Sequence, residues 1–107
     1  KIIGDVQGKN VIILDDMVDT AGTITKAADL MIENGALSVR AFASHGVLSD
    51  PATERIEKSK LTAIYFTDSI PLKKESEKIK VLSVADLIAN TIINVNTNKS
   101  ISSSYLV

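Results

Sequence analysis

Hydrophobic residues fall along this chain in short runs that alternate with segments of helical periodicity. The first run, Val11–Leu14, is unbroken and rich in β-branched residues, as is typical of a strand buried on both faces of a parallel sheet. Residues 39–43, 62–66 and 80–82 are also rich in apolar residues and are predicted to be strands. The pattern therefore predicts four short strands.

A helix is predicted between the first two of these strands. Over residues 22–34, apolar residues recur at intervals of three and four positions and so share one face; they are Ile24, Ala27, Ala28 and Met31. Asn34-Gly35 follows this stripe, and a glycine at that place is a common helix stop. The spacing therefore predicts an amphipathic helix.

Two further helices are predicted. The shorter one extends to about Lys58 and begins at Asp50-Pro51, which we interpret as a helix N-cap followed by proline in the first helical position. The other follows Ser83, a predicted cap, with Asp86 three residues later in a near capping-box arrangement. Its apolar stripe consists of Val84, Leu87, Ile88, Ile92 and Val95.

Strands that alternate with helices are typical of βαβ units, so we predict an α/β fold in three layers, with a mainly parallel sheet flanked by helices. Ligands of such sheets bind beyond the carboxyl ends of the strands. Three polar segments follow predicted strands at that edge, namely Asp15-Asp16, Ser44-His45-Gly46 and Thr67-Asp68-Ser69. These segments are therefore predicted to converge on one site.

The segment after the first strand combines carboxylates with small residues. Three acids, Asp15, Asp16 and Asp19, lead into the loop Thr20-Ala21-Gly22-Thr23, and the predicted helix begins in this loop. The first turn of a helix has unpaired N–H groups and a partial positive charge, so small residues there let an anion approach closely. The two threonines add hydroxyl donors. The loop is therefore predicted to bind phosphate.

The acids suggest what else the ligand carries. Carboxylates accept hydrogen bonds from the vicinal hydroxyls of a sugar, or bind Mg²⁺ through oxygen. Acids beside a phosphate-binding loop therefore favour a sugar phosphate. The alternative is purely structural: Asp19 caps the helix, and the other acids are solvated loop residues. Two adjacent acids, a third acid and the small-residue loop together favour the ligand.

Composition excludes several classes of protein. The 12 basic and 13 acidic residues leave a net charge near zero, which argues against a nucleic-acid binder that works by neutralising phosphates. No residue is cysteine, so disulfides and thiolate zinc sites are excluded. No apolar run approaches the ~18 residues of a membrane span, and the N-terminus does not resemble a signal peptide. We therefore expect a cytoplasmic protein that binds neither nucleic acid nor membrane.

The stretch DDMVDTAGT resembles the phosphoribosyl-diphosphate-binding motif of the ribose-phosphate diphosphokinases, or phosphoribosyl pyrophosphate synthetases. Further stretches resemble that family in order and spacing: GDVQGKNVIILDD, ASHGVLSDPATERI, TDSIP and IKVLSVADLIANTI. The resemblance covers essentially all 107 residues. It implies a type I phosphoribosyltransferase-like fold and, because family members are much longer, the C-terminal part of such an enzyme.

The resemblance also implies roles for particular residues. In the family the paired acids, here Asp15 and Asp16, bind the ribose hydroxyls, and the loop, here Asp19, Thr20, Ala21, Gly22 and Thr23, binds the 5-phosphate. The implied reaction transfers the diphosphoryl group of ATP to the C1 hydroxyl of ribose 5-phosphate, with Mg²⁺ as cofactor, and yields 5-phosphoribosyl 1-diphosphate. The metal ligands are left unassigned. Family members are homo-oligomers, typically hexamers built from dimers, and many are regulated by ADP and phosphate.

Other parts of such an enzyme are expected to lie outside this sequence. The family's mobile loop, whose Lys and Arg stabilise the transition state, lies upstream, so we assign no catalytic residue to this chain. Residues 1–96 are expected to form the C-terminal domain, incomplete at its N-terminus, and residues 97–107 to form a tail at an interface. We expect this chain alone to bind a sugar phosphate weakly and not to catalyse.

The tail carries a second resemblance. In regulated family members, serines near the C-terminus help to hold the phosphate of an allosteric nucleotide at a subunit interface. The implied residues here are Ser102, Ser103 and Ser104, although the family usually has valine at the second of these positions. A serine-rich tail without such a role is the alternative.

Two other functions stay open. A type I phosphoribosyltransferase would use the same loop, but such enzymes usually carry a second Thr and Gly where this chain has Asp19-Thr20-Ala21-Gly22. A non-catalytic, synthetase-associated regulatory subunit would keep the fold and lose the activity. Such proteins often have a degraded acidic motif, whereas the acids and threonines are intact here.

Overall fold

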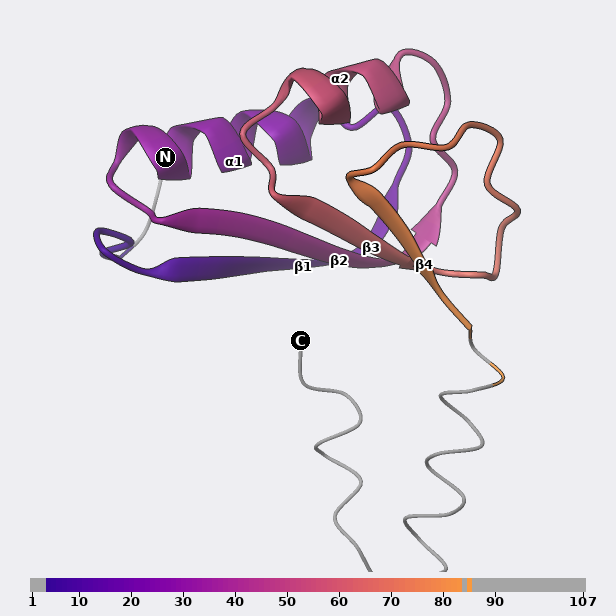
Figure 1. Cartoon of the computed structure of the whole chain (residues 1–107), viewed down its shortest axis with the longest axis horizontal. Helices are drawn as coiled ribbons and strands as arrows, with labels where there is room; N and C mark the ends of the chain where they lie inside the picture. The colour runs from indigo at the N-terminus through magenta and orange to yellow at the C-terminus, as the bar shows by residue number, and fades with distance from the viewer. Residues whose placement is uncertain (1–3, 84, 86–107) are drawn as a thin grey trace, which may run out of the picture.

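The computed structural model describes residues 4–83 and residue 85. Within them, four strands form a single parallel sheet in chain order: β1 (Asn10–Val18), β2 (Ser38–Gly46), β3 (Ala63–Thr67) and β4 (Ile79–Leu82). Helix α1 (Gly22–Glu33) connects β1 to β2, and α2 (Ala52–Lys58) connects β2 to β3 (Figure 1). The predicted α/β class with a mainly parallel sheet is confirmed, whereas the described helices form one layer on the sheet and not the two that a three-layer fold requires (Figure 1).

Helix α1 begins and ends close to its predicted limits. Its predicted apolar stripe faces the sheet, and Ile24 and Ala28 are buried. The helix ends in a Schellman motif, because the N–H of Ala36 donates to the carbonyl of Met31 and the N–H of Gly35 to that of Ile32, both at 3.0 Å. Gly35 has a φ of 96°, a conformation that glycine adopts without strain, which explains the Asn-Gly stop.

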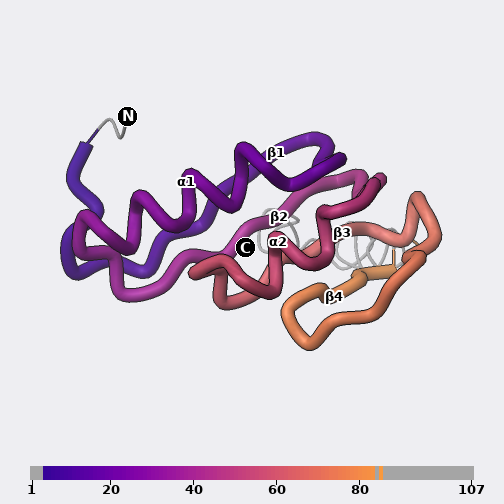
Figure 2. Tube along the Cα trace, turned by 90° about the horizontal axis from the view of Figure 1, so that it is seen from above, coloured from indigo at the N-terminus to yellow at the C-terminus, as the bar shows by residue number. Residues whose placement is uncertain are grey.

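Both helices lie on the same face of the sheet, as Figures 1 and 2 show from two directions. Successive right-handed connections between parallel strands in the order β1-β2-β3 place their helices on one side. The core lies between these helices and the sheet. Its largest fully buried side chains are Ile56 of α2, Val39 and Ile64 of the strands, and Leu61 between α2 and β3.

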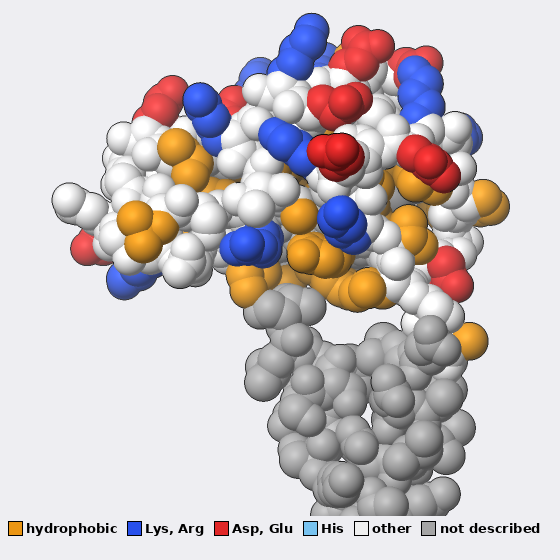
Figure 3. Space-filling view, in the orientation of Figure 1, with side chains coloured by type: hydrophobic (Ala, Val, Ile, Leu, Met, Phe, Trp, Pro, Cys, Tyr) orange, Lys and Arg blue, Asp and Glu red, His pale blue; other side chains and the backbone are white. Residues whose placement is uncertain are grey.

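The opposite face of the sheet carries exposed apolar side chains in the described part of the chain. Ile12 is 44% exposed, Leu14 68% and Leu82 45%. Figure 3 shows hydrophobic side chains along this underside of the sheet. The prediction that Val11–Leu14 is buried on both faces is therefore wrong for the described residues, because α1 and α2 cover one face and leave the alternate side chains of β1 uncovered.

Two predicted elements lie outside the described residues. These are the helix after Ser83, apart from Ala85, and the tail at residues 97–107. Among the helices that are described, none has the length and apolar character needed to cross a membrane.

Candidate functional site

The paired acids belong to the last part of β1 and do not follow it as the sequence indicated. β1 continues to Val18, with Asp15 opposite Ala43 and Met17 opposite His45 of β2. The carboxylate of Asp15 accepts a hydrogen bond from the N–H of Asp16 at 2.8 Å. Both acids are exposed, and within the described residues the Asp16 side chain has no hydrogen bond or ion pair. The carboxylates are therefore open to a ligand at the carboxyl end of the sheet.

The other two predicted segments meet at the same edge. The Oγ1 of Thr67, at the end of β3, donates to the carbonyl of Ser44 in β2. The Nδ1 of His45 lies 2.7 Å from the Oγ of Ser69, so the turn after β3 is tied to the end of β2. Because His45 is also the neighbour of Met17 in the sheet, all three segments lie along one edge, as predicted.

The loop between β1 and α1 is fixed in an unusual conformation at Ala21. This residue precedes the helix with φ 64° and ψ 10°, in the left-handed region, and its side chain is only 4% exposed. Its carbonyl accepts hydrogen bonds from the N–H of Thr25 at 3.1 Å and from the Oγ1 of Thr25 at 2.6 Å. The described residues offer no partner to the N–H groups of Gly22 and Thr23. These groups are therefore donors available to an anion.

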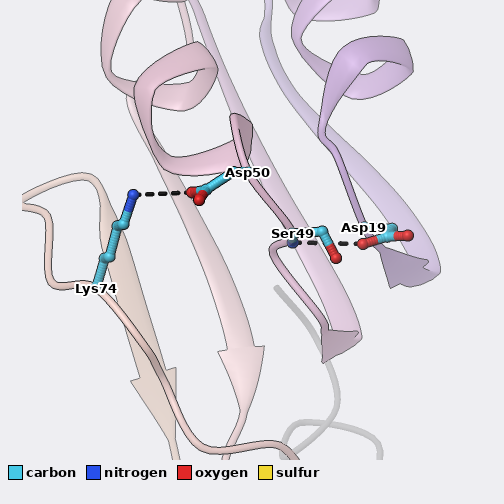
Figure 4. Close-up of polar contacts among 4 residues, drawn as sticks. All are labelled: Asp19, Ser49, Asp50 and Lys74. Atoms are coloured by element: carbon cyan, nitrogen blue, oxygen red, sulfur yellow. Dashed lines mark hydrogen bonds and ion pairs between the residues drawn. The ribbon is translucent and has the colours of Figure 1, made fainter.

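Asp19 supports the loop in a different way from the cap considered in the sequence. Its Oδ1 accepts a hydrogen bond from the N–H of Ser49 at 3.3 Å, across 30 residues of sequence (Figure 4). The residue at the cap position of α1 is Ala21, and no side chain caps the helix. The alternative in which Asp19 caps α1 is therefore wrong: its carboxylate joins the loop to the segment after β2.

A second distant contact reaches the loop from α2. The Nη1 of Arg55 donates to the carbonyl of Thr20 at 3.2 Å, across 35 residues of sequence. Neither Ser49 nor Arg55 was predicted to be part of the site. Sequence patterns gave no signal for them, because both contacts depend on how α2 packs beside α1.

Asp50 was predicted to cap α2, and this prediction is wrong. Helix α2 begins at Ala52 after Pro51 and has no side-chain cap. The Asp50 carboxylate instead pairs with the ammonium of Lys74 at 2.8 Å (Figure 4). The hydrogen bond and the charge of Lys74 lower the pKa of Asp50 below its usual value, and the same contacts with Asp50 raise the pKa of Lys74. This exposed pair lies beside the site, and none of the acids predicted to bind the ligand takes part in it.

Magnesium was expected as a cofactor, so the oxygen ligands that the described residues offer are relevant. Within residues 4–83 and 85, no three His, Asp or Glu side chains converge as a ready-made metal cage. Mg²⁺ usually binds through one or two carboxylates together with waters and substrate phosphates. The exposed carboxylates of Asp15 and Asp16 fit that mode. The predicted allosteric residues Ser102, Ser103 and Ser104 lie outside the described residues.

Comparisons with known proteins agree with the resemblance found in the sequence. The family model described as the phosphoribosyl synthetase-associated domain matches residues 1–107. The chain is 60% identical over 105 residues to a ribose-phosphate pyrophosphokinase of Porphyromonas gingivalis and 54% identical over 105 residues to one of Wolinella succinogenes. In both cases the match covers 98% of this chain and 34% of the relative.

Solved structures give the same result. The crystal structure of phosphoribosylpyrophosphate synthetase from Mycobacterium smegmatis matches with a TM-score of 0.77 and 44% sequence identity, over 90% of this chain and 33% of that one. This chain therefore spans about a third of the length of the relatives it matches. Both the sequence profile and the three-dimensional match confirm the predicted relationship. The chain belongs to the phosphoribosyl synthetase-associated domain family.

Proposed function

We propose that this chain is the ribose-5-phosphate-binding part of a ribose-phosphate diphosphokinase. The whole enzyme transfers the diphosphoryl group of ATP to the C1 hydroxyl of ribose 5-phosphate and forms 5-phosphoribosyl 1-diphosphate. The observation that carries this proposal is the juxtaposition of two exposed carboxylates at the end of β1 with free N–H groups at the start of α1. The relatives reported above are named for this activity, which favours it over a phosphoribosyltransferase.

The two parts of the site bind opposite ends of the substrate. The N–H groups of Gly22 and Thr23 and the hydroxyl of Thr23 donate to the 5-phosphate, helped by the positive end of the α1 dipole. Asp15 and Asp16 accept hydrogen bonds from the ribose hydroxyls. Binding both ends fixes the orientation of the sugar, so that its C1 hydroxyl is held for attack on the diphosphoryl group.

Mg²⁺ is the cofactor that this donor set suits, and its role when bound is to neutralise charge on the phosphates. Asp15 and Asp16 are the residues in this chain that would hold it together with substrate oxygens. The carboxylates therefore have two compatible uses, as acceptors for the sugar and as metal ligands.

The remaining features of the proposal concern the whole protein. We propose that it is a cytoplasmic homo-oligomer that also binds ATP. We further propose that Ser102, Ser103 and Ser104 contribute to inhibition by ADP. Replacing Ser104 by alanine in the whole enzyme should then weaken ADP inhibition, and unchanged inhibition would remove the regulatory role.

The test is calorimetric titration of ribose 5-phosphate, with Mg²⁺ present, into the whole protein that carries this sequence. Asp16→Asn removes one acid of the site, and Glu33→Gln removes an exposed acid at the far end of α1 as the matched control. Ribose serves as the ligand without the phosphate. We expect binding in the wild type and in Glu33→Gln, weaker binding in Asp16→Asn, and weaker binding of ribose than of ribose 5-phosphate. Equal affinity in all three proteins would refute the assigned site.

A further inference from the structure

The loop that precedes α1 is held from outside by α2 through the guanidinium of Arg55. Its Nη1 donates to the carbonyl of Thr20 at 3.2 Å. The same nitrogen lies over Gly22, because a Cβ built on that glycine would be 3.1 Å from it. A small residue at position 22 therefore serves a second purpose besides the close approach of an anion: it admits the guanidinium to the start of the helix.

This hydrogen bond fixes the direction in which a loop donor points. The peptide between Thr20 and Ala21 is planar and trans, so its C=O and its N–H point in opposite directions. Because Arg55 holds the carbonyl of Thr20 towards α2, the N–H of Ala21 is turned away from α2. The described residues offer no partner to this N–H either, so it is a further donor of the phosphate loop. The guanidinium thus orients a donor of that loop without forming part of it.

The conformation of Ala21 needs such support. A residue other than glycine in the left-handed region is strained and persists only where its surroundings hold it there. Thr25 holds the carbonyl on one side of Ala21, and Arg55 holds the carbonyl on the other side. These two contacts restrain the rotation of the backbone on both sides of Ala21.

The charge of Arg55 has a consequence of its own. Asp15, Asp16 and Asp19 are exposed and precede the loop, so they place negative charge near it, which repels a phosphate. Within the described residues Arg55 has no carboxylate partner, since its recorded side-chain hydrogen bond is to a backbone carbonyl. Its positive charge at the loop therefore offsets part of that repulsion.

We propose that Arg55 is a positioning residue for the phosphate of the substrate. It holds the Thr20–Ala21 peptide so that the loop amides face the anion, and its positive charge reduces the repulsion between the acidic edge and the phosphate. This inference rests on the proposed function, because it assumes that the loop binds the 5-phosphate. It assigns to α2 a role in substrate affinity and none in the chemical step.

The experiment compares Arg55→Met with Lys58→Met in the whole protein. Both residues are exposed cations on α2, and both line the cleft of about 330 Å³ between the two helices beside Gly22. Only Arg55 donates to the loop. The variants therefore remove the same charge from the same helix with and without the loop contact. Titrations with ribose 5-phosphate and with ribose, together with kcat and the KM values for both substrates, give the readout.

We expect Arg55→Met to raise the Kd for ribose 5-phosphate about tenfold, as for the loss of one hydrogen bond from a charged donor. The KM for ribose 5-phosphate should rise likewise, whereas kcat and the KM for ATP, the affinity for ribose, and every property of Lys58→Met should stay near the wild-type values. A merely structural role would move all of these values together. Should Arg55→Met lower the folded fraction, Arg55→Lys keeps the charge, presents no planar fork, and is expected to weaken binding several-fold.

Three results would overturn the inference, and they differ in what they say about the site. Wild-type affinity in the Arg55 variants removes the positioning role while the proposed function stands. Equal losses in Arg55→Met and Lys58→Met reduce the role of Arg55 to general charge and likewise leave the function standing. A wild-type protein that does not bind ribose 5-phosphate at all refutes the proposed function, and the inference falls with it.

Discussion

Replacing Gly46 by alanine should destabilise the fold, because this glycine lies directly against a buried aromatic ring. A Cβ at position 46 would lie 2.9 Å from both Cγ and Cδ1 of Phe66. Phe66 is only 2% exposed, so its ring has no free space into which to turn. Either the ring in β3 or the end of β2 must move. The end of β2 pairs with Val18, the residue before Asp19, so that movement also reaches the candidate site.

The size of the effect follows from two opposed terms. Overpacking of a closely packed core costs about 1–3 kcal/mol. Replacing glycine by alanine also restricts the unfolded chain, which returns about 0.4–1 kcal/mol of stability. The net loss should be about 1–2 kcal/mol, and for a domain of this size each kcal/mol lowers Tm by roughly 4–8 °C. Gly46→Ala should therefore melt clearly below the wild type.

Urea denaturation of the purified chain measures this loss as a lower midpoint at an unchanged slope. Gly22→Ala is the comparison variant, because its new Cβ would meet the end of the exposed Arg55 side chain, which can yield at a lower cost than a buried ring. Phe66→Leu in the Gly46→Ala background replaces the ring with a smaller side chain, so the double variant should be more stable than the sum of the single losses indicates. Wild-type stability in Gly46→Ala, or strictly additive losses, would refute the proposed clash.

Two further predictions concern α2 and its neighbourhood. Ile56→Ala empties a site that is 0% exposed and should cost about 2–5 kcal/mol in urea denaturation, against about 0.5–1.5 for Ile56→Val; equal losses would contradict the burial. Lys74→Met should raise the pKa of Asp50 towards 3.8 in an NMR titration, because Lys74 lowers it. The sign follows from the lowered pKa: the pair stabilises the fold above pH 3.8, and this contribution is lost as the pH falls through the pKa of folded Asp50. An unmoved titration midpoint in Lys74→Met would show that the two groups do not interact in solution.

Local signals in the sequence predicted the parts of the fold that depend on local chemistry. The apolar stripe and the Asn34-Gly35 stop gave the limits of α1 to within a residue, because both the periodicity and the glycine conformation are properties of neighbouring residues. Because acids occupy the end of β1, the apolar run predicted a shorter strand than the one observed. The apolar run ends at Leu14 because polar residues follow it, whereas the pairing of β1 with β2 continues through Asp15 to Val18.

The sequence could not show which face of the sheet the helices cover or what holds the loop. The run Val11–Leu14 has the same appearance whether one or both faces are covered, and the side on which α1 and α2 lie depends on the handedness of successive connections. The contacts of Ser49 with Asp19 and of Arg55 with Thr20 join residues 30 and 35 positions apart. No local pattern encodes such contacts, since they exist only after the helices pack.

At this site, substitutions of Ala21 separate the effect of backbone conformation on stability most clearly from the effect of side-chain chemistry. Ala21→Gly relieves a left-handed strain of about 1–2 kcal/mol. It also loses a buried methyl group, worth about 0.8 kcal/mol, and frees the unfolded chain by about 0.5–1 kcal/mol. These terms nearly cancel, so its stability should stay within about 0.5 kcal/mol of the wild type. Ala21→Val places a β-branched residue at a φ of 64° in a buried position and should cost more than about 2 kcal/mol. Urea denaturation of the wild type and the two variants tests the left-handed conformation of Ala21. A valine variant as stable as the wild type would mean that the loop adopts another conformation. The proposed orientation of its amides towards a phosphate would then lose its structural basis.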